Sequence, residues 1–330
     1  MNLKFKEIVL VSIIAVILMT TLMTGYAQVF EPTRFITGIA WAAAGGGSDR
    51  FVRAIQIAND RNEGIIDVPI AAITRPGGGG AEGMRYLLQQ PADGHHFLGV
   101  TPSGVFTSLS VDLGWDFSNF RAVMQAGVEP LHLAIRTDDE RFSNIEEFVE
   151  YAKANPGELS IGTFGAGSQM DVALLLFVRG VGIDVNSIPF DGTPRRQAAL
   201  LGKHIDASVN NVADDFELMR GGEMVSILHF SDTRMSSIPD VPTIPELYGF
   251  SVGIDQWRGF VLHGDTPDYI VDWYEDKFKQ LYDTTHFQDY LEAEGIEPLY
   301  RNAEEFQDYL LNYQETIRSI YQEFKLGIYQ

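Results

Sequence analysis

The chain has 330 residues, of which 45% are hydrophobic and 21% charged, and its formal net charge is −21 at pH 7. This length is enough for two domains of ordinary size, and a chain this acidic is a poor partner for nucleic acid or for an anionic membrane surface. It contains no cysteine, which excludes disulfides, thiolate metal sites, a cysteine nucleophile and a cysteine-linked lipid anchor.

The N-terminal segment has the layout of a secretory signal peptide. Two lysines precede an apolar run over residues 8–19, and small residues stand at positions 25 and 27. We expect cleavage after Ala27, which leaves a mature, periplasmic chain that starts at Gln28. An uncleaved membrane anchor is the alternative, because the apolar run is long. Residues 1–27 carry a net charge of +1, so the mature chain would carry about −22.

Strand and helix signals alternate along the mature chain. The predicted strands are short apolar runs at residues 35–40, 67–74, 97–101, 121–136, 159–163, 187–190, 207–210, 224–230 and 256–262. The predicted helices cover residues 49–59, 81–89, 143–154, 169–179, 194–201, 214–220 and 267–282, with helix for the rest of the chain. This alternation predicts an α/β fold in which mainly parallel sheets are flanked by helices.

The chain is predicted to cross between two domains twice. The first crossing lies near Gly127–Pro130, where the long strand over residues 121–136 is broken by Glu129-Pro130, and the second lies near Pro245–Trp257. The two crossings predict a discontinuous first domain, residues 28–127 plus 251–330, and a continuous second domain, residues 128–250.

Glycine-rich turns follow predicted strands in both halves of the chain. They are WAAAGGGSDR at Trp41–Arg50, RPGGGGA at Arg75–Ala81 and FGAGS at Phe164–Ser168. Glycine permits positive φ and close approach of another group, and the helix that follows presents unpaired N–H groups and a positive dipole end. Such a turn can bind a phosphate, a sulfate or a carboxylate. The structural alternatives are a tight turn capped by Ser48 or Asp49 and, for the four consecutive glycines, a floppy surface loop.

Several polar or aromatic residues near the other strand ends allow two interpretations each. The Ser168 hydroxyl would cap a helix or donate to a ligand carboxylate. The pair Arg195-Arg196 would be held by an anion or be solvated beside acidic neighbours. Asn210 offers an amide donor or only loop polarity, and Trp257 would pack in the core or hinge or contact a ligand. Arg258 would form a bidentate pair with a ligand carboxylate or a structural salt bridge.

Local motifs for catalysis are not found. The seven histidines show no HExxH motif and no paired metal-ligand spacing, and the Gly-Ala-Gly-Ser-Gln run at residues 165–169 lacks the last glycine of a nucleophile elbow. The sequence therefore predicts no catalytic residue, no metal site and no cofactor, although local motifs do not test a site that is assembled in space.

Eight short motifs occur together in a specific order and spacing. They are AGGGSD (Ala44–Asp49), RPGGGGA (Arg75–Ala81), PADG (Pro91–Gly94), GAGS (Gly165–Ser168), PFDG (Pro189–Gly192), LLGKHID (Leu200–Asp206), PDVPTIPE (Pro239–Glu246) and WRG (Trp257–Gly259). With these motifs the mature chain, from about Phe30 to Gln322, resembles the extracytoplasmic solute-binding proteins of tripartite tricarboxylate transporters, often called Bug receptors.

The resemblance implies a two-domain Venus-flytrap fold of the type II periplasmic class. It also implies a carboxylate ligand held in the cleft by backbone amides and small polar side chains, and delivery to a membrane permease with one large and one small subunit. We carry the family's ligand contacts over to the matching motifs of this chain and add Trp257 and Arg258 of the WRG motif. The predicted ligand contacts are then Ala44, Gly45, Gly46, Gly47, Ser48, Gly77, Gly78, Gly79, Gly80, Ser168, Gln169, Asp191, Gly192, Asn210, Trp257 and Arg258. The AGGGSD and WRG forms are closer to the tricarboxylate-binding branch than to the amino-acid-binding one.

Two positions depart from the family pattern. Asp191 stands where the family often has Lys or another residue, and an acid there would repel a carboxylate or recognise an amine. The aromatic residue of the first loop is Trp41, followed by three alanines, so that wall of the cleft would have a different shape.

These features together predict an exported receptor for a small di- or tricarboxylate, with no nucleic acid partner. The alternatives from other classes are an exported hydrolase that uses the same cleft and a ligand sensor for a two-component system.

Overall fold

The structure, a computed structural model, describes residues 29–62, 64–165, 167–190, 192–235 and 237–329. The predicted signal peptide with its cleavage site, and the predicted ligand contact Asp191, lie outside the described residues. Within those residues, every helix is too short or too polar to cross a membrane.

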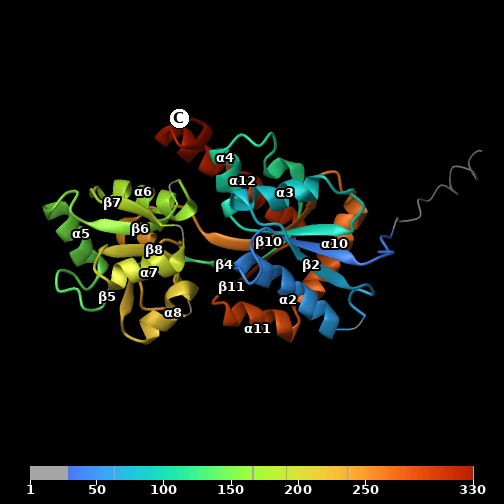
Figure 1. Cartoon of the computed structure of the whole chain (residues 1–330), viewed down its shortest axis with the longest axis horizontal. Helices are drawn as coiled ribbons and strands as arrows, with labels where there is room; N and C mark the ends of the chain where they lie inside the picture. The colour runs from blue at the N-terminus through green and yellow to red at the C-terminus, as the bar shows by residue number, and fades with distance from the viewer. Residues whose placement is uncertain (1–28, 63, 166, 191, 236, 330) are drawn as a thin grey trace, which may run out of the picture.

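The described strands form two sheets, one in each of two lobes (Figure 1). The six-stranded sheet has the order β11-β4-β10-β3-β1-β2. Its strands are β1 (Ile36–Ala40), β2 (Ile70–Thr74), β3 (His96–Val100), β4 (Phe120–Glu129), β10 (Gln256–His263) and β11 (Glu297–Arg301). The five-stranded sheet has the order β7-β6-β8-β5-β9. Its strands are β5 (Leu131–Arg136), β6 (Ser160–Phe164), β7 (Asn186–Phe190), β8 (Ala207–Asn211) and β9 (Met224–His229).

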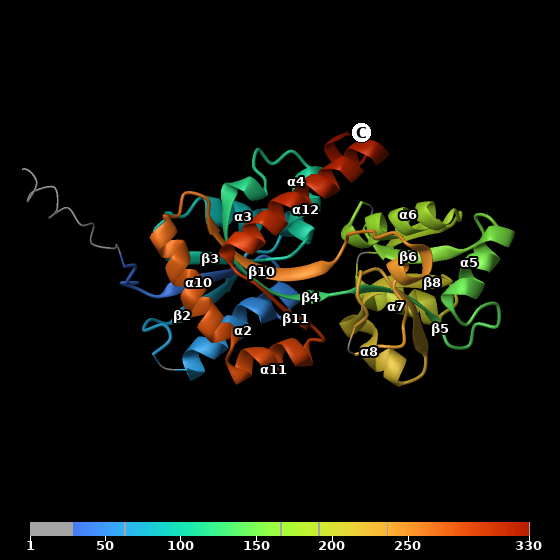
Figure 2. The same ribbon diagram turned by 180° about the vertical axis from the view of Figure 1, so that it is seen from behind.

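Helices cover both faces of each sheet (Figures 1 and 2). Around the first sheet they are α2 (Gly47–Arg61), α10 (Asp268–Tyr282) and α11 (Thr285–Ala293) on one face, and α3 (Ala81–Leu88), α4 (Ser103–Ser110) and α12 (Ala303–Phe324) on the other. Around the second sheet they are α5 (Ile145–Ala154), α6 (Gln169–Val181) and α9 (Ile244–Tyr248) on one face, and α7 (Thr193–Leu201) and α8 (Val212–Arg220) on the other. Short 3-10 turns are η1 (Gly78–Gly80), η2 (Phe117–Asn119) and η3 (Gly327–Tyr329).

The α/β fold is as predicted, but the sheets are mixed rather than mainly parallel. In the first sheet β1 pairs in parallel with β2 and β3, whereas β10 runs antiparallel to both of its neighbours, β3 and β4. In the second sheet β6 is parallel to β7 and β8, whereas β5 is antiparallel to β8 and β9. The strands that run opposite to the rest of their sheet are β10 and β11 in the first sheet and β5 in the second. Strands β5 and β10 each follow a crossing, where the chain enters a sheet from the other lobe without the helical crossover that parallel neighbours require.

One extended run passes from the first sheet to the second. Strand β4 ends at Glu129 and β5 begins at Leu131, so Pro130 lies between the sheets. A proline has no N–H to donate to a ladder, which suits the point where pairing changes from one sheet to the other. The return connection runs from the end of β9 to the start of β10. Figure 2 shows both connections between the lobes.

Three elements differ from the sequence-based prediction. Strand β11 lies in a region predicted to be helical, and α4 and α9 lie where no helix is predicted. Strand β11 has only five residues, includes Pro298 and pairs antiparallel with β4, so its conformation depends on a distant partner. Helix α4 has the sequence SGVFTSLS, whose serines, threonine and glycine have weak helix propensity.

Candidate ligand-binding site

The carboxyl ends of the parallel strands point toward the crossings in both lobes. Val100, the last residue of β3, lies opposite Gly259 near the start of β10, and Asn211, the last residue of β8, lies opposite Leu131 at the start of β5. The turns that follow these strands therefore face the other lobe. In open α/β sheets this edge is where ligands bind.

The first glycine turn ends at an uncapped helix. Gly46 is the N-cap of α2, and no side chain caps that helix end. The Ser48 hydroxyl is buried and accepts a hydrogen bond from the Trp41 N–H at 3.3 Å, and the Gly45 N–H donates to Asp49 Oδ2 at 2.8 Å. Ser48 and Gly45 thus hold the turn itself, and the N–H groups at the start of α2 are left without a side-chain cap.

Arg258 lies directly beside the start of α2. A Cβ atom at Gly47 would be 3.1 Å from Arg258 Nη2, so the absence of a side chain at Gly47 leaves room for the guanidinium. Arg258 Nε donates to Glu129 Oε1, and both side chains are buried. Burial raises the pKa of the Glu129 carboxyl above its ordinary value, and the Arg258 charge opposes that shift. Of the two predicted roles for Arg258, the structure shows the salt bridge.

Trp257 belongs to the core. Its side chain is fully buried, and its ring packs edge-on against Phe306 and Tyr313, with centroids 5.5 and 5.8 Å away. Trp41 is also buried, at 7% exposure. A Cβ atom at Gly80 would lie 2.8 Å from the Trp41 ring. The first-loop aromatic residue therefore packs against the second glycine turn.

The four consecutive glycines all have positive φ. The values are 138° at Gly77, 56° at Gly78, 63° at Gly79 and 105° at Gly80, and residues with a Cβ rarely adopt such angles. The Thr107 hydroxyl of α4 donates to the Gly79 carbonyl at 2.9 Å. This turn is therefore a defined structure held by α4 rather than a floppy loop, and no side chain caps helix α3 that follows it.

In the second lobe, the start of α6 is capped by a side chain of the predicted turn that precedes it. The Ser168 hydroxyl is the N-cap acceptor for the Asp171 N–H at 3.4 Å, and the Gly167 N–H donates to Asp171 Oδ2 at 2.8 Å. Gln169 is buried, at 7% exposure. Gly192 is the N-cap of α7, which has no side-chain cap.

Asn210 takes part in a buried polar network beneath this edge. Its side chain accepts a hydrogen bond from Arg196 Nε and donates to Ser208 and Asp215. Arg196 is fully buried and not solvated, and burial lowers its pKa. Asp215 also contacts His132 Nε2 at 3.1 Å. Burial alone would raise the pKa of Asp215, but these hydrogen bonds outweigh it and lower the pKa.

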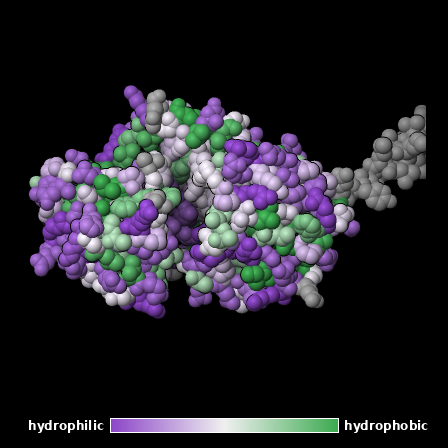
Figure 3. Space-filling view, viewed as in Figure 1, coloured by the Kyte–Doolittle hydropathy of each residue, from purple (hydrophilic) through white to green (hydrophobic). Residues whose placement is uncertain are grey.

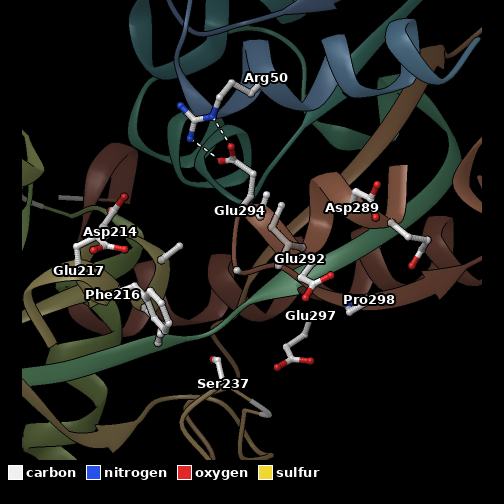
Figure 4. Close-up of a pocket in the computed structure, with 16 residues that line it drawn as sticks. Arg50, Asp214, Phe216, Glu217, Ser237, Asp289, Glu292, Glu294, Glu297 and Pro298 are labelled. Atoms are coloured by element: carbon white, nitrogen blue, oxygen red, sulfur yellow. Dashed lines mark hydrogen bonds and ion pairs between the residues drawn. The ribbon is translucent and has the colours of Figure 1, made fainter. Parts of the chain in front are cut away.

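A cavity of about 930 Å³ lies between the lobes (Figures 3 and 4). The first lobe lines it with Arg50, the end of α11 and the start of β11, and the second lobe with the start of α8 and Ser237. Its charged side chains are Arg50, Asp214, Glu217, Asp289, Glu292, Glu294 and Glu297. Arg50 pairs with Glu294 at 2.6 Å and also donates to the Gly45 carbonyl at 2.7 Å.

The cavity therefore adjoins the first glycine turn, but none of the predicted contact residues that the structure describes is among those that line it. None of the sequence motifs predicts this lining. The Arg50–Glu294 pair joins residues 244 positions apart, and no local pattern links them.

Two α/β lobes whose strand ends face each other across a cavity are the architecture of a periplasmic binding protein, and solved structures confirm the fold. A TctC solute-binding protein from Polaromonas matches with a TM-score of 0.77 and 22% identity over 89% of this chain and all of that one. MatC from Rhodopseudomonas palustris with bound malate has a TM-score of 0.71 and 22% identity, over 88% of this chain and 99% of that one. A protein from R. palustris with adipate has a TM-score of 0.74 and 21% identity, over 90% and 99%.

The chain belongs to the tripartite tricarboxylate transporter receptor family, whose profile matches residues 55–326. Among its sequence relatives, a UPF0065 protein of Bordetella pertussis is 24% identical over 87% of this chain and 88% of its own length. The protein BugT of the same organism is 26% identical over 73% and 74%. The protein is accordingly a solute-binding receptor of the transport class, as the motifs predict.

Proposed function

We propose that the protein is an exported receptor that captures a small di- or tricarboxylate between its lobes and delivers it to a membrane permease with one large and one small subunit. The observation that carries the proposal is the uncapped start of α2, which faces the second lobe beside the buried Arg258. Malate and adipate, bound by two structural relatives, are dicarboxylates, and the names of the relatives describe receptors rather than enzymes.

Capture requires that the lobes move relative to each other. We place the boundaries at the two crossings, so that residues 28–127 and 251–330 form one domain and residues 128–250 the other. Closure about the two connections would bury the ligand and create the surface that the permease recognises. Export after cleavage at Ala27 belongs to the same proposal.

The protein's own negative charge does not prevent anion binding. Helix dipoles and N–H groups act on a ligand oxygen at about 3 Å, whereas surface carboxylates are screened by salt beyond a Debye length of about 8 Å. The acidic cavity wall opposes a carboxylate at short range, so we place the ligand carboxylates at the uncapped starts of α2, α3 and α7. The contacts from Gly77 to Gly80, and those at Gln169 and Gly192, are part of this proposal.

Calorimetry tests the ligand class directly. We expect the mature protein to bind at least one acid from a panel of malate, adipate and a tricarboxylate, with one ligand per chain, and to bind its monoamide more weakly. Heat from none of these acids, or turnover of an ester or amide analogue, would contradict the proposal.

A Gly79→Val variant tests the second glycine turn. Valine at φ 63° is strained, and its Cβ would lie 2.5 Å from Thr107 Oγ1, so the turn has to shift. We expect at least about tenfold weaker binding of the preferred acid, roughly 1.4 kcal/mol, the loss of one charge-assisted hydrogen bond or more. Gly114→Ala is the matched control, because Gly114 also has positive φ, at 71°, but a Cβ atom there has no neighbour within 4 Å. Unchanged affinity in a folded Gly79→Val variant would show that this turn does not take part in ligand binding.

A further inference from the structure

The C-terminal end of α12 contacts the second lobe. Helix α12 packs along β4 of the first sheet, and Figure 2 shows its last turns extending toward the side of α6. Tyr321, in these last turns, is fully buried. Its hydroxyl donates to the Gly167 carbonyl at 2.6 Å. Gly167 belongs to the glycine turn before α6, so a hydrogen bond joins the first lobe to a predicted ligand-binding turn of the second.

The Tyr321 hydroxyl donates its one proton to the Gly167 carbonyl. The other polar neighbour of the hydroxyl is Ser110 Oγ of α4, at 3.2 Å. Ser110 donates its own proton to the Phe106 carbonyl at 2.7 Å. Because each hydroxyl has one proton, the shorter contact to Gly167 is the strong one and the contact with Ser110 is weak.

Helix α4 contacts one predicted ligand turn directly and the other through Tyr321. Thr107 holds the Gly79 carbonyl, and Ser110, one turn further along α4, lies against Tyr321, which in turn holds Gly167. The relative position of the turns at Gly79 and Gly167 therefore depends on packing around α4 and the end of α12.

The ion pair between α6 and α12 across this boundary is weak by comparison. Arg179 of α6 pairs with Glu323 at 2.5 Å, but the two side chains are 58% and 56% exposed, and such surface pairs contribute little. The hydrogen bond from the buried Tyr321 to the half-buried Gly167 is less exposed to solvent than this ion pair.

We propose that Tyr321 is a positioning residue for ligand binding, which holds the glycine turn before α6 against the first lobe in the arrangement that binds the ligand. The inference rests on the proposed function, because it assigns that turn to the ligand site. The hydroxyl acts through Gly167 and does not itself contact the ligand.

Tyr321→Phe removes the hydroxyl and keeps the ring. We expect the affinity for the acid identified by calorimetry to fall about three- to tenfold, the size expected for one neutral hydrogen bond. In the ligand-free protein, we expect backbone amides within residues 161–172 to exchange with solvent faster by a similar factor.

Tyr313→Phe is the matched control. Tyr313 also lies on α12 and is 5% exposed, but its hydroxyl has no hydrogen-bond partner among the described residues. Removing that hydroxyl should leave both the affinity and the exchange of residues 161–172 unchanged.

The two measurements separate failure of this inference from failure of the proposed function. If the unmodified protein binds no acid, the proposed function fails, and equal exchange in Tyr321→Phe and the parent would then overturn the contact itself. If an acid binds, unchanged affinity in Tyr321→Phe overturns the inference, whether or not exchange increases. Equal losses of affinity in Tyr321→Phe and Tyr313→Phe would also overturn it, because they would reflect general packing of α12.

Discussion

Arg258→Met is expected to lower the free energy of unfolding by about 3–5 kcal/mol, because it leaves Glu129 buried without its partner. The side chains of Arg258 and Glu129 are only 8% and 5% exposed, and they lie where the chain passes between the lobes. Methionine keeps most of the apolar stem of arginine, so the loss reports on the unpaired carboxylate and not on a cavity. Denaturant unfolding of the mature protein at pH 7 measures the change.

Two further variants control this result. In the double variant Arg258→Met, Glu129→Leu no member of this buried pair remains charged, and we expect most of the lost stability to return. Arg85→Met breaks the Arg85–Glu82 pair, whose side chains are 48% and 50% exposed, and should change stability by less than about 0.5 kcal/mol. A loss below about 1 kcal/mol in Arg258→Met would show that the pair is not a determinant of stability.

His229 is expected to make the protein less stable as the pH falls from about 6.5 to about 4. It is fully buried on β9, opposite His132 of β5. Burial lowers its pKa to about 4, and the neighbouring His132 and Arg234 act in the same direction. The unfolded chain, in which a histidine has a pKa of about 6.5, then binds the proton more tightly than the native state does. The stability contributed by neutral His229 is present above pH 6.5 and is lost toward pH 4, by up to roughly 3 kcal/mol.

The comparison with a variant isolates this effect. Burial also raises the pKa of Asp255 to about 6, and that shift lowers stability as the pH rises from 3.8 to 6, against the trend from His229. We therefore expect the stability of His229→Gln to fall less than that of the parent between pH 6.5 and 4, by about 2–3 kcal/mol. If the free energy of unfolding changes with pH equally in the two proteins, His229 is not the cause of the pH dependence.

Local patterns predict much of the fold because its elements are local. The alternation of apolar runs and amphipathic stretches predicts the α/β class, and the break at Glu129-Pro130 falls where β4 ends and β5 begins. The turn at Gly77–Gly80 is predictable because four positive φ angles require glycine. The sense of β10 and the existence of β11 are not predictable in this way, because both are set by pairing with β4.

In the candidate site, too, contacts within a short segment could be predicted from the sequence, and contacts between distant segments could not. Ser168 as a helix cap depends on Asp171, three residues away, and was one of its two predicted roles. The salt bridge of Arg258 was predicted as a type of interaction, but its partner Glu129 lies 129 residues away and could not be identified. The lining of the cavity between the lobes brings Arg50 of α2 together with α8 and α11, which only the tertiary fold does. Contact of the ligand with Asp191, and with the other predicted residues, stays a prediction.

Mass spectrometry of the ligand released from the exported protein, purified without added acids, is the most direct test of the central claim. The protein should release one small organic acid with at least two carboxylates, and that acid should rebind to the emptied protein with one molecule per chain. A released ligand that carries no carboxylate, or an emptied protein that rebinds none of the di- and tricarboxylates, would contradict the account.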